Sequence, residues 1–312
     1  MTLIELIEAT EQQLTDAQVA FGHGTDNAFD EAAWLVLWRL GLPLDSALDE
    51  PEHAPESVAQ RLITPLEQTQ VAALVQERIA SRKPAAYLTR EAWLQGVPFY
   101  VDERAIVPRS LIAEVLVSGG LDPWLPDVPL QVLDLCTGNA SLAVIAALAY
   151  PQMEICASDI SDDALAVAHI NVERHGLQSR IALLCGDGLH APALQEHAAF
   201  DLIVCNPPYV NAQSMAALPP EYRAEPALAL AGGSDGMDFI RHLLADAPAH
   251  LTSQGVLVLE IGNERAHFEA AFPTLEVVWL ETSAGEDQVL LLTRSALRAE
   301  VMDRHGLKAS MR

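Results

Sequence analysis

The sequence has few basic residues. Lysine and arginine together number 18 against 43 aspartates and glutamates, which gives a formal net charge of −25 over 312 residues. Tight, sequence-independent binding to phosphate backbones needs clustered basic side chains, so this composition argues against stable nucleic-acid binding. A basic protein substrate suits the charge better, although a role of the acidity in solubility alone explains it equally well.

Long apolar runs are also missing. The longest, such as residues 142–150, are interrupted by charges and prolines and stop far short of the roughly 20 residues that a membrane span needs. Glu5, Glu8 and Glu11 stand where a secretory signal would carry basic residues ahead of an apolar block. We therefore expect an unprocessed cytoplasmic chain that does not associate with a membrane.

Cysteine is scarce as well. The four cysteines, at positions 136, 156, 185 and 205, form no CxxC pair and have no histidine beside them at ligand spacing. We expect no metal site and interpret these residues as small core side chains in a reducing compartment.

The first third of the chain has a helical pattern. Leu3, Leu6 and Leu14 fall on one face of a helix. In Thr64-Pro65-Leu66-Glu67 the threonine can cap a helix, the proline suits its first position and the glutamate completes a capping box. We predict a helical domain over residues 1–90.

A linker is predicted over residues 91–127. Trp93, Val97, Phe99 and Val101 alternate with more polar positions between residues 92 and 107, and this period of two indicates a β-hairpin. Apolar residues between 111 and 116 then predict a short helix, and a region rich in glycine and proline marks the next boundary.

From residue 128 to residue 294 apolar runs alternate with helical segments, as expected of parallel strands buried on both faces. The expected strands cover residues 130–136, 153–158, 181–185, 200–205, 255–261, 275–280 and 288–293. The last two flank a short polar turn, so they should form an antiparallel hairpin at the end of the sheet. The pattern predicts a doubly wound, Rossmann-like α/β sheet of seven strands.

The end of the chain reverses the charge. Residues 295–312 carry Arg298, Arg304, Lys308 and Arg312 with few large apolar side chains. We expect this basic C-terminal tail to be a solvated or frayed helix.

The first candidate site is the turn Asp134-Leu135-Cys136-Thr137-Gly138-Asn139-Ala140, which leads from a strand into a helix. Gly138 allows a ligand to approach the backbone closely. The turn lacks GxGxxG, which disfavours a pyrophosphate cofactor and leaves room for a cofactor without phosphates. An ordinary strand-to-helix turn is the alternative interpretation.

The ends of the next two strands carry acidic residues. Asp159 follows the turn by about 20 residues, the spacing at which a carboxylate binds ribose hydroxyls. Asp187, followed by Gly188, could accept a hydrogen bond from an adenine amino group. A helix-start residue is the alternative for Asp159, which its spacing from Gly138 disfavours, and an ordinary turn is the alternative for Gly186-Asp187-Gly188. Together the three strand ends predict a nucleoside site.

The segment Asn206-Pro207-Pro208-Tyr209 follows a buried strand next to the first turn in the expected sheet. The prolines fix two successive φ angles. The Asn206 side-chain oxygen and the Pro207 carbonyl can accept both N–H bonds of a planar amino group, and the Tyr209 ring can pack on that group. Such a nitrogen is a poor nucleophile, so we expect catalysis mainly by positioning. A rigid turn without catalytic purpose is the alternative.

Residues 206–209, taken with the 134–140 turn, Asp159 and Asp187, resemble the amino-methyltransferases, which include adenine-N6 nucleic-acid enzymes and protein glutamine-N5 enzymes. The resemblance implies a class I methyltransferase sheet, S-adenosyl-L-methionine as methyl donor and no metal. It implies catalytic roles for Asn206, Pro207, Pro208 and Tyr209. It implies cofactor binding by Asp134, Cys136, Thr137, Gly138, Asn139, Ala140, Asp159, Asp187, Gly188 and Asn206.

Further segments, 99–104, 107–110 and 225–236, resemble the HemK-like protein glutamine methyltransferases. The release-factor enzymes of that family continue Pro-Arg with Pro-Glu-Thr-Glu, whereas Pro108-Arg109 is followed here by Ser110-Leu111-Ile112. This difference, together with residues 82–89 and 91–93, resembles the ribosomal-protein branch. One departure is Asn139-Ala140 in place of the family's usual second glycine, from which we expect lower affinity for the donor.

The substrate of that branch is a glutamine in the third protein of the large (50S) ribosomal subunit. The resemblance therefore implies methyl transfer to the side-chain amide nitrogen (N5) of that glutamine and a helical substrate-recognition domain. Two other substrates remain open: a release factor, and an adenine in a nucleic acid. A non-catalytic nucleotide-binding module is a third alternative, for which the rigid segment 206–209, here called the acceptor segment, would have no purpose.

Overall fold

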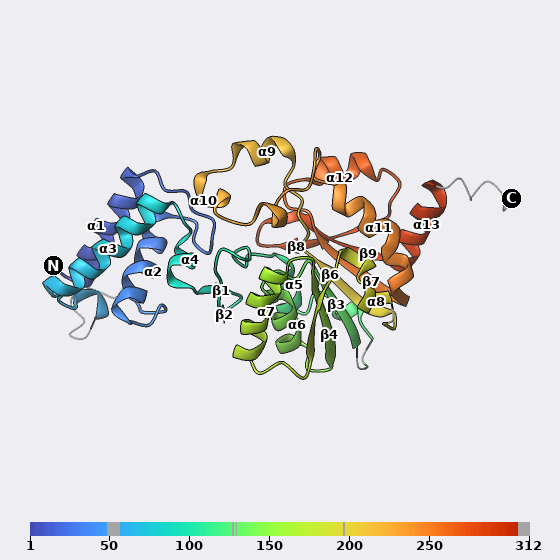
Figure 1. Cartoon of the computed structure of the whole chain (residues 1–312), viewed down its shortest axis with the longest axis horizontal. Coiled ribbons are helices and arrows are strands. Elements are labelled where there is room, and N and C mark those ends of the chain that lie inside the picture. The colour runs from blue at the N-terminus through green and yellow to red at the C-terminus, as the bar shows by residue number, and fades with distance from the viewer. Residues whose placement is uncertain (49–56, 127, 129, 196, 305–312) are drawn as a thin grey trace.

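The computed structural model describes residues 1–48, 57–126, 128, 130–195 and 197–304. A group of N-terminal helices lies on one side of the molecule, and an α/β sheet lies on the other (Figure 1). The N-terminal group contains α1 (Leu3–Asp16), α2 (Ala28–Leu40), η1 (Val58–Gln60), α3 (Pro65–Ser81) and α4 (Ala85–Thr89).

Capping boxes start two of these helices. The Thr2 hydroxyl accepts a hydrogen bond from the Glu5 N–H, and the Glu5 carboxylate accepts one from the Thr2 N–H. Thr64 and Glu67 make the same exchange at α3, with Pro65 in its first turn, which confirms the predicted helix start. The apolar faces of α1, α2 and α3 pack into one hydrophobic cluster, so these helices have a core of their own.

The β-hairpin after α4 is shorter than predicted. β1 (Ala92–Leu94) pairs with β2 (Val97–Phe99) through the two-residue turn Gln95-Gly96, whose φ angles are both positive. Pairing stops there because the backbone of Tyr100 instead exchanges two hydrogen bonds with the side chain of Asn171. The alternating pattern up to residue 107 therefore reflects burial of the following valines, not strand pairing.

The predicted α/β sheet is confirmed. Its strands are β3 (Leu130–Leu135), β4 (Met153–Asp159), β5 (Ile181–Cys185), β6 (Phe200–Cys205), β7 (Leu251–Glu260), β8 (Val278–Thr282) and β9 (Gly285–Thr293). They lie in the order β5-β4-β3-β6-β7-β9-β8, and β9 runs antiparallel to both of its neighbours. The antiparallel strand thus lies one place inside the edge, because β8 forms the edge itself. The strand order reverses between β3 and β6, and ligands bind at such a point in open sheets.

Helices cover both faces of the sheet. Neighbouring residues of β3 contribute to opposite faces, with Val132 in one hydrophobic cluster and Leu133 in the other. One cluster includes residues of α5 (Ile112–Val117), α6 (Ser141–Ala149) and α7 (Asp162–Arg174), and the other includes residues of α8 (Pro192–Gln195), α11 (Asp238–His250), α12 (Arg265–Ala271) and α13 (Arg294–Arg304). The remaining short helices are η2 (Asp122–Trp124), η3 (Gly188–His190), α9 (Ala212–Ala217), α10 (Pro220–Arg223) and η4 (Ala227–Ala229). Within the described residues, no helix combines the length and apolar character that crossing a bilayer requires.

The expectation of a solvated C-terminal tail is wrong for its described part. Helix α13 packs on α11, β7 and β9. Leu297 is fully buried in the core, and the Arg294 guanidinium donates a hydrogen bond to the Pro248 carbonyl. One well-placed leucine thus anchors the helix although its mean hydropathy is low. Residues 305–312, with Lys308 and Arg312, lie outside the described part.

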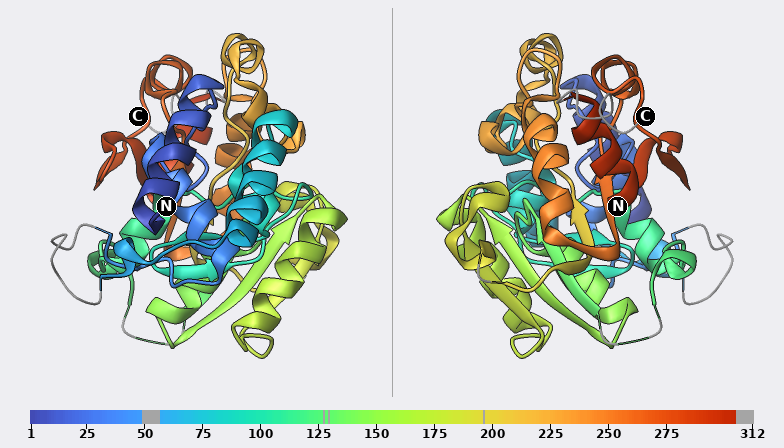
Figure 2. Two further views of the ribbon diagram at one scale, coloured as in Figure 1. Left: turned by 90° about the vertical axis from the view of Figure 1, so that its left-hand side faces the viewer. Right: turned by 90° about the vertical axis from the view of Figure 1, so that its right-hand side faces the viewer.

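Buried charges join the N-terminal helices to the loop after β6. Arg78 of α3, which is fully buried, donates to the Glu31 carboxylate of α2 at 2.8 Å and lies 3.5 Å from Glu221 of α10. Arg82, directly after α3, contacts the same Glu221 oxygen at 2.7 Å. Figure 2 shows the segment that carries α9 and α10 beside α3. Because buried charges need partners, these contacts fix the helices against the loop.

Replacing Arg78 by methionine leaves the buried Glu31 carboxylate without its arginine and leaves Glu221 with only the Arg82 contact among the described residues. We expect the free energy of unfolding to fall by about 3–5 kcal/mol, measured by urea denaturation. The control is Lys83→Met, which removes an exposed pair with Glu103 and should change stability by less than about 1 kcal/mol. Equal losses in the two variants would contradict the role of burial.

Candidate active site

The turn after β3 has an unusual backbone. Cys136, Gly138 and Ala140 all have φ angles near 60°, the left-handed region that favours glycine. At Gly138 a Cβ atom would meet nothing within 4 Å, because the turn faces open space there. Ala140 adopts this conformation while fully buried, at a cost of about 1 kcal/mol relative to glycine. The alanine at position 140, where the family usually has a glycine, therefore strains the backbone of this turn but is accommodated in the core.

Several predicted cofactor residues stabilise this turn through hydrogen bonds on the side away from the cavity. The Asp134 carboxylate accepts hydrogen bonds from the Thr137 hydroxyl at 2.5 Å and from the Ala143 N–H at 3.0 Å. Complete burial raises the pKa of Asp134 to about 7. The Asn139 side chain accepts a bond from the Ser141 N–H at the start of α6. Asp134, Thr137, Asn139 and Ala140 do not line the neighbouring cavity, so they hold the turn in place.

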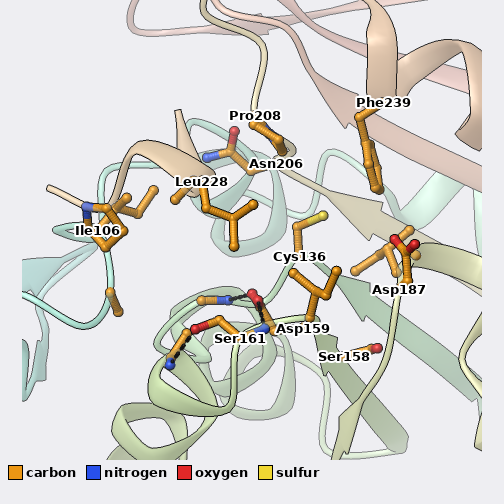
Figure 3. A pocket seen from close by; sticks show the side chains of 18 of the residues that line it. Ile106, Cys136, Ser158, Asp159, Ser161, Asp187, Asn206, Pro208, Leu228 and Phe239 are labelled. Carbon is orange, nitrogen blue, oxygen red and sulfur yellow. Dashed lines mark hydrogen bonds between the residues drawn. The ribbon is translucent and has the colours of Figure 1, made fainter. Parts of the chain in front are cut away.

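Asp159, at the end of β4, faces the cavity beside the turn (Figure 3). Its carboxylate accepts hydrogen bonds from the Gly138 N–H at 2.8 Å and from the Ser161 N–H at 2.9 Å. Burial is the largest influence on this carboxyl and raises its pKa. An ionised carboxylate has about four acceptor sites, so acceptor capacity remains for a ligand beside these backbone bonds.

The cavity encloses a space of about 850 Å³, which includes the part that is open to solvent. It brings together several of the predicted residues, namely Cys136, Gly138, Asp159, Asp187, Gly188, Asn206 and Pro208. Asp187 and Phe239 lie at one end and Ile106 at the other, with Asp159 between them (Figure 3). The three strand ends predicted to form a nucleoside site thus border a single cavity.

Asn206 and Pro208 line the cavity above Asp159 (Figure 3). No described residue makes a hydrogen bond to the Asn206 side-chain amide, so both its oxygen and its nitrogen are available to a ligand. Pro207 is buried beneath them. The two prolines therefore present a polar amide at the edge of a largely apolar cavity.

The packing of the Tyr209 ring on the substrate stays a prediction, and the contacts that the structure gives this side chain are with the protein. This side chain does not line the cavity. The hydroxyl instead donates to the Glu260 carboxylate at 3.3 Å, and the ring lies so close to Gly262 that a Cβ there would approach it to 2.5 Å. Burial, with Glu260 nearby, raises the pKa of this phenol. Tyr209 thus fixes the backbone of the acceptor segment from behind.

Two buried carboxylates tie the linker to the site. Glu225 accepts two hydrogen bonds of 2.7 Å from the Arg109 guanidinium and one of 2.9 Å from the Val107 N–H. Glu260 accepts bonds from the Ser110 hydroxyl at 2.6 Å and from the Leu111 N–H at 2.9 Å. Segments 107–110 and 225–236, which resemble the HemK-like family separately, are therefore in direct contact.

Sequence reasoning missed several residues of the cavity wall. Ile160, Leu228 and Phe239 supply apolar surface, and Arg104 supplies a positive charge. Ile160 is half exposed. Because it directly follows Asp159, the ribose candidate, its apolar side chain could have been predicted from the sequence to line the cavity. Leu228 lies on the short helix η4 and Phe239 at the start of α11, and tertiary contacts set the approach of both helices to the cavity.

These residues fit S-adenosyl-L-methionine. A ribose requires a carboxylate beside an open backbone turn, as Asp159 and Gly138 provide. An adenine requires apolar walls with a polar group at its edge, as Ile160, Phe239 and Asp187 provide. In the part of the chain that the structure describes, no cluster of three or more potential metal ligands occurs.

The pKa of the Glu225 carboxyl lies at about 2, because the charges of Arg109 and His23 and their hydrogen bonds outweigh the opposing effect of burial. A carboxyl whose pKa falls from 4.5 to about 2 contributes about 3 kcal/mol of stability above pH 4.5, which is lost as the pH falls toward 2. We expect Glu225→Gln to destabilise the protein by that amount at neutral pH and by less near pH 3, measured by urea denaturation. The exposed Glu281 offers a control, Glu281→Gln. A loss that is the same at both pH values would contradict the assignment.

Comparisons with known proteins agree with this geometry. A family model described as a methyltransferase small domain matches residues 122–218. The ribosomal protein uL3 glutamine methyltransferase of Bordetella pertussis is 54% identical over 300 residues, which cover 95% of this chain and 96% of that protein. A protein of the same name from Neisseria gonorrhoeae is 46% identical over 304 residues, with 96% of each chain covered.

Among solved structures, the catalytic domain of hMettl16 in complex with MAT2A 3′UTR hairpin 1 matches with a TM-score of 0.51. It covers 76% of this chain and 83% of that chain at 15% identity, so the likeness shows the fold alone. The relatives, in contrast, match nearly the full length of both chains, and they confirm the resemblance to the ribosomal-protein branch. The chain belongs to the family of ribosomal protein uL3 glutamine methyltransferases.

Proposed function

We propose that this protein transfers a methyl group from S-adenosyl-L-methionine to the side-chain amide nitrogen (N5) of a glutamine in ribosomal protein uL3. The observation that carries the proposal is the Asn206 amide, which borders the same cavity as Asp159 and has no protein partner among the described residues. Family membership supports the substrate.

The residues around the 134–140 turn hold the donor in this proposal. Asp159 accepts hydrogen bonds from the ribose hydroxyls, and Asp187 accepts one from the adenine amino group. The backbone at Gly138 and Cys136 lies against the methionine part, where the absence of a side chain at Gly138 leaves room. When bound, the donor supplies an electrophilic methyl group on a positively charged sulfur.

Asn206 and Pro207 orient the acceptor. The Asn206 side-chain oxygen and the Pro207 carbonyl accept the two N–H bonds of the glutamine amide and direct its lone pair toward the methyl group. Since that lone pair is delocalised, the gain comes from orientation and from hydrogen bonds that favour its localisation. The methylated nitrogen loses its extra proton readily to water, so the mechanism assigns no general base.

The N-terminal helices are the proposed substrate-recognition domain, over residues 1–90, with residues 91–127 as linker and residues 128–294 as catalytic domain. The helices have their own core, and Arg78 and Arg82 connect them to the loop that follows Asn206. The net charge of −25 suits a basic ribosomal protein. A substrate of this kind implies a cytoplasmic enzyme.

Replacing Asn206 by alanine removes one of the two acceptors for the glutamine N–H bonds. We expect kcat to fall by about 10²–10³-fold while the Kd for the donor, measured by calorimetry, changes by less than about threefold. The control is Gln213→Ala, which removes an exposed amide on α9 and should leave both quantities unchanged. An Asn206→Ala enzyme with unaltered kcat would contradict the mechanism.

The substrate is tested by mass spectrometry of ribosomal proteins and release factors from cells that lack the gene. We expect one glutamine peptide of uL3 to lose a methyl group, a difference of about 14 Da, with all release-factor peptides unchanged. Loss of the methyl group from a release factor would identify the alternative protein substrate. Incorporation of labelled methyl groups into RNA or DNA by the purified protein would favour the adenine-N6 alternative.

A further inference from the structure

Arg104 is the single basic residue among the described residues that line the cavity. Its side chain is about one-third exposed, so it reaches the cavity wall without being enclosed. The proposed function gives this residue no role. A cation in a site for a small, charged molecule indicates an anionic group on the ligand.

Asp102 holds the Arg104 guanidinium in one orientation. Arg104 Nε donates to Asp102 Oδ1 at 2.9 Å, and Arg104 Nη2 donates to Asp102 Oδ2 at 2.7 Å. The Tyr100 hydroxyl donates to the same carboxylate at 2.8 Å. These bonds keep the pKa of Asp102 at about 2, so the pair stays ionised across the physiological range. The arginine is therefore preorganised before any ligand binds.

One edge of the guanidinium remains free. An arginine has five N–H donors in a fixed fork, and Asp102 takes one from Nε and one from Nη2. Among the described residues, the hydrogen bonds of the Arg104 guanidinium come from Nε and Nη2, and none comes from Nη1. The free Nη1 and the second N–H of Nη2 form an edge that can donate two parallel hydrogen bonds to a carboxylate in the cavity.

The position of Arg104 corresponds to one end of the donor. Asp187 lies at one end of the cavity, Asp159 lies in the middle, and Ile106 lies at the other end (Figure 3). With adenine at Asp187 and ribose at Asp159, the methionine part extends toward Ile106, and Arg104 precedes Ile106 by two residues in the same wall. The methionine carboxylate is the one anionic group of the donor.

We propose that Arg104, oriented by Asp102, binds the carboxylate of the methionine part of the donor. The inference rests on the proposed function, since it takes S-adenosyl-L-methionine as the ligand. Arg104 contributes its free N–H donors and its positive charge, and no covalent bond is made or broken. A contact between Arg104 and an acidic group of the protein substrate is the competing explanation.

The test compares two non-reactive ligands that differ only in this carboxylate, S-adenosylhomocysteine and its decarboxylated analogue S-adenosyl-3-thiopropylamine. Their Kd values are measured by calorimetry on the full chain. We expect Arg104→Gln to raise the Kd for S-adenosylhomocysteine by about 10–100-fold, which is the effect of losing a hydrogen bond to a charged group. Binding of the decarboxylated analogue should change by less than about twofold.

Lys83→Gln is the matched control, because it removes a nearby exposed cation that pairs with Glu103 and does not line the cavity. It should leave both Kd values unchanged, and Arg104→Lys should restore part of the lost affinity. Unchanged binding of S-adenosylhomocysteine by Arg104→Gln, or an equal loss for both ligands, would overturn the inference. A rise in KM for uL3 without a change in either Kd would assign Arg104 to the protein substrate. Failure of the folded wild-type protein to bind S-adenosylhomocysteine would instead contradict the proposed function itself.

Discussion

The ion pair between Glu225 and Arg109 is the contact on which the arrangement of the site depends. Glu225 also accepts the Val107 N–H and lies 3.4 Å from His23. One buried carboxylate thus joins three stretches that are far apart in sequence: the loop between α1 and α2, the linker after the hairpin and the loop that follows residues 206–209. The helical turn directly after Glu225 carries Leu228 into the cavity wall. A charge in the interior must be matched in position as well as in sign, so this pair restricts where each stretch can lie.

The sequence predicted those parts of the fold that depend on local signals. β5 and β6 match their predicted limits to the residue. β6 is buried on both faces and therefore largely apolar, whereas β5 has an apolar sequence although it forms the edge of the sheet. The start of α3 follows from three neighbouring residues, Thr64, Pro65 and Glu67, whose interactions are all within one turn. The meeting of the 134–140 turn, Asp159 and Asp187 could be predicted because the carboxyl ends of parallel strands share one edge of a sheet.

The remaining features depend on contacts across the chain. The orientation of Tyr209 is set by Glu260 and by the absence of a side chain at Gly262, neither of which is close to it in sequence. The docking of α13 depends on Leu297, which composition alone does not distinguish from a leucine in a frayed helix. Strand pairing ends after Phe99 because Asn171 binds the next residue, although the alternating pattern continues. Arg104 and Phe239 reach the cavity from distant segments, so no local motif marks them.

The buried contacts of Arg78 with Glu31 and Glu221 have a consequence for the history of the family. Loss of the Arg78 cation would leave Glu31 without its arginine and Glu221 with Arg82 alone, so the acceptable replacements at each of these positions depend on the residues at the others. Substitutions at these positions are therefore epistatic, and the helices and the active-site loop must diverge together. An exchange of the whole helical part between distant relatives would break these contacts.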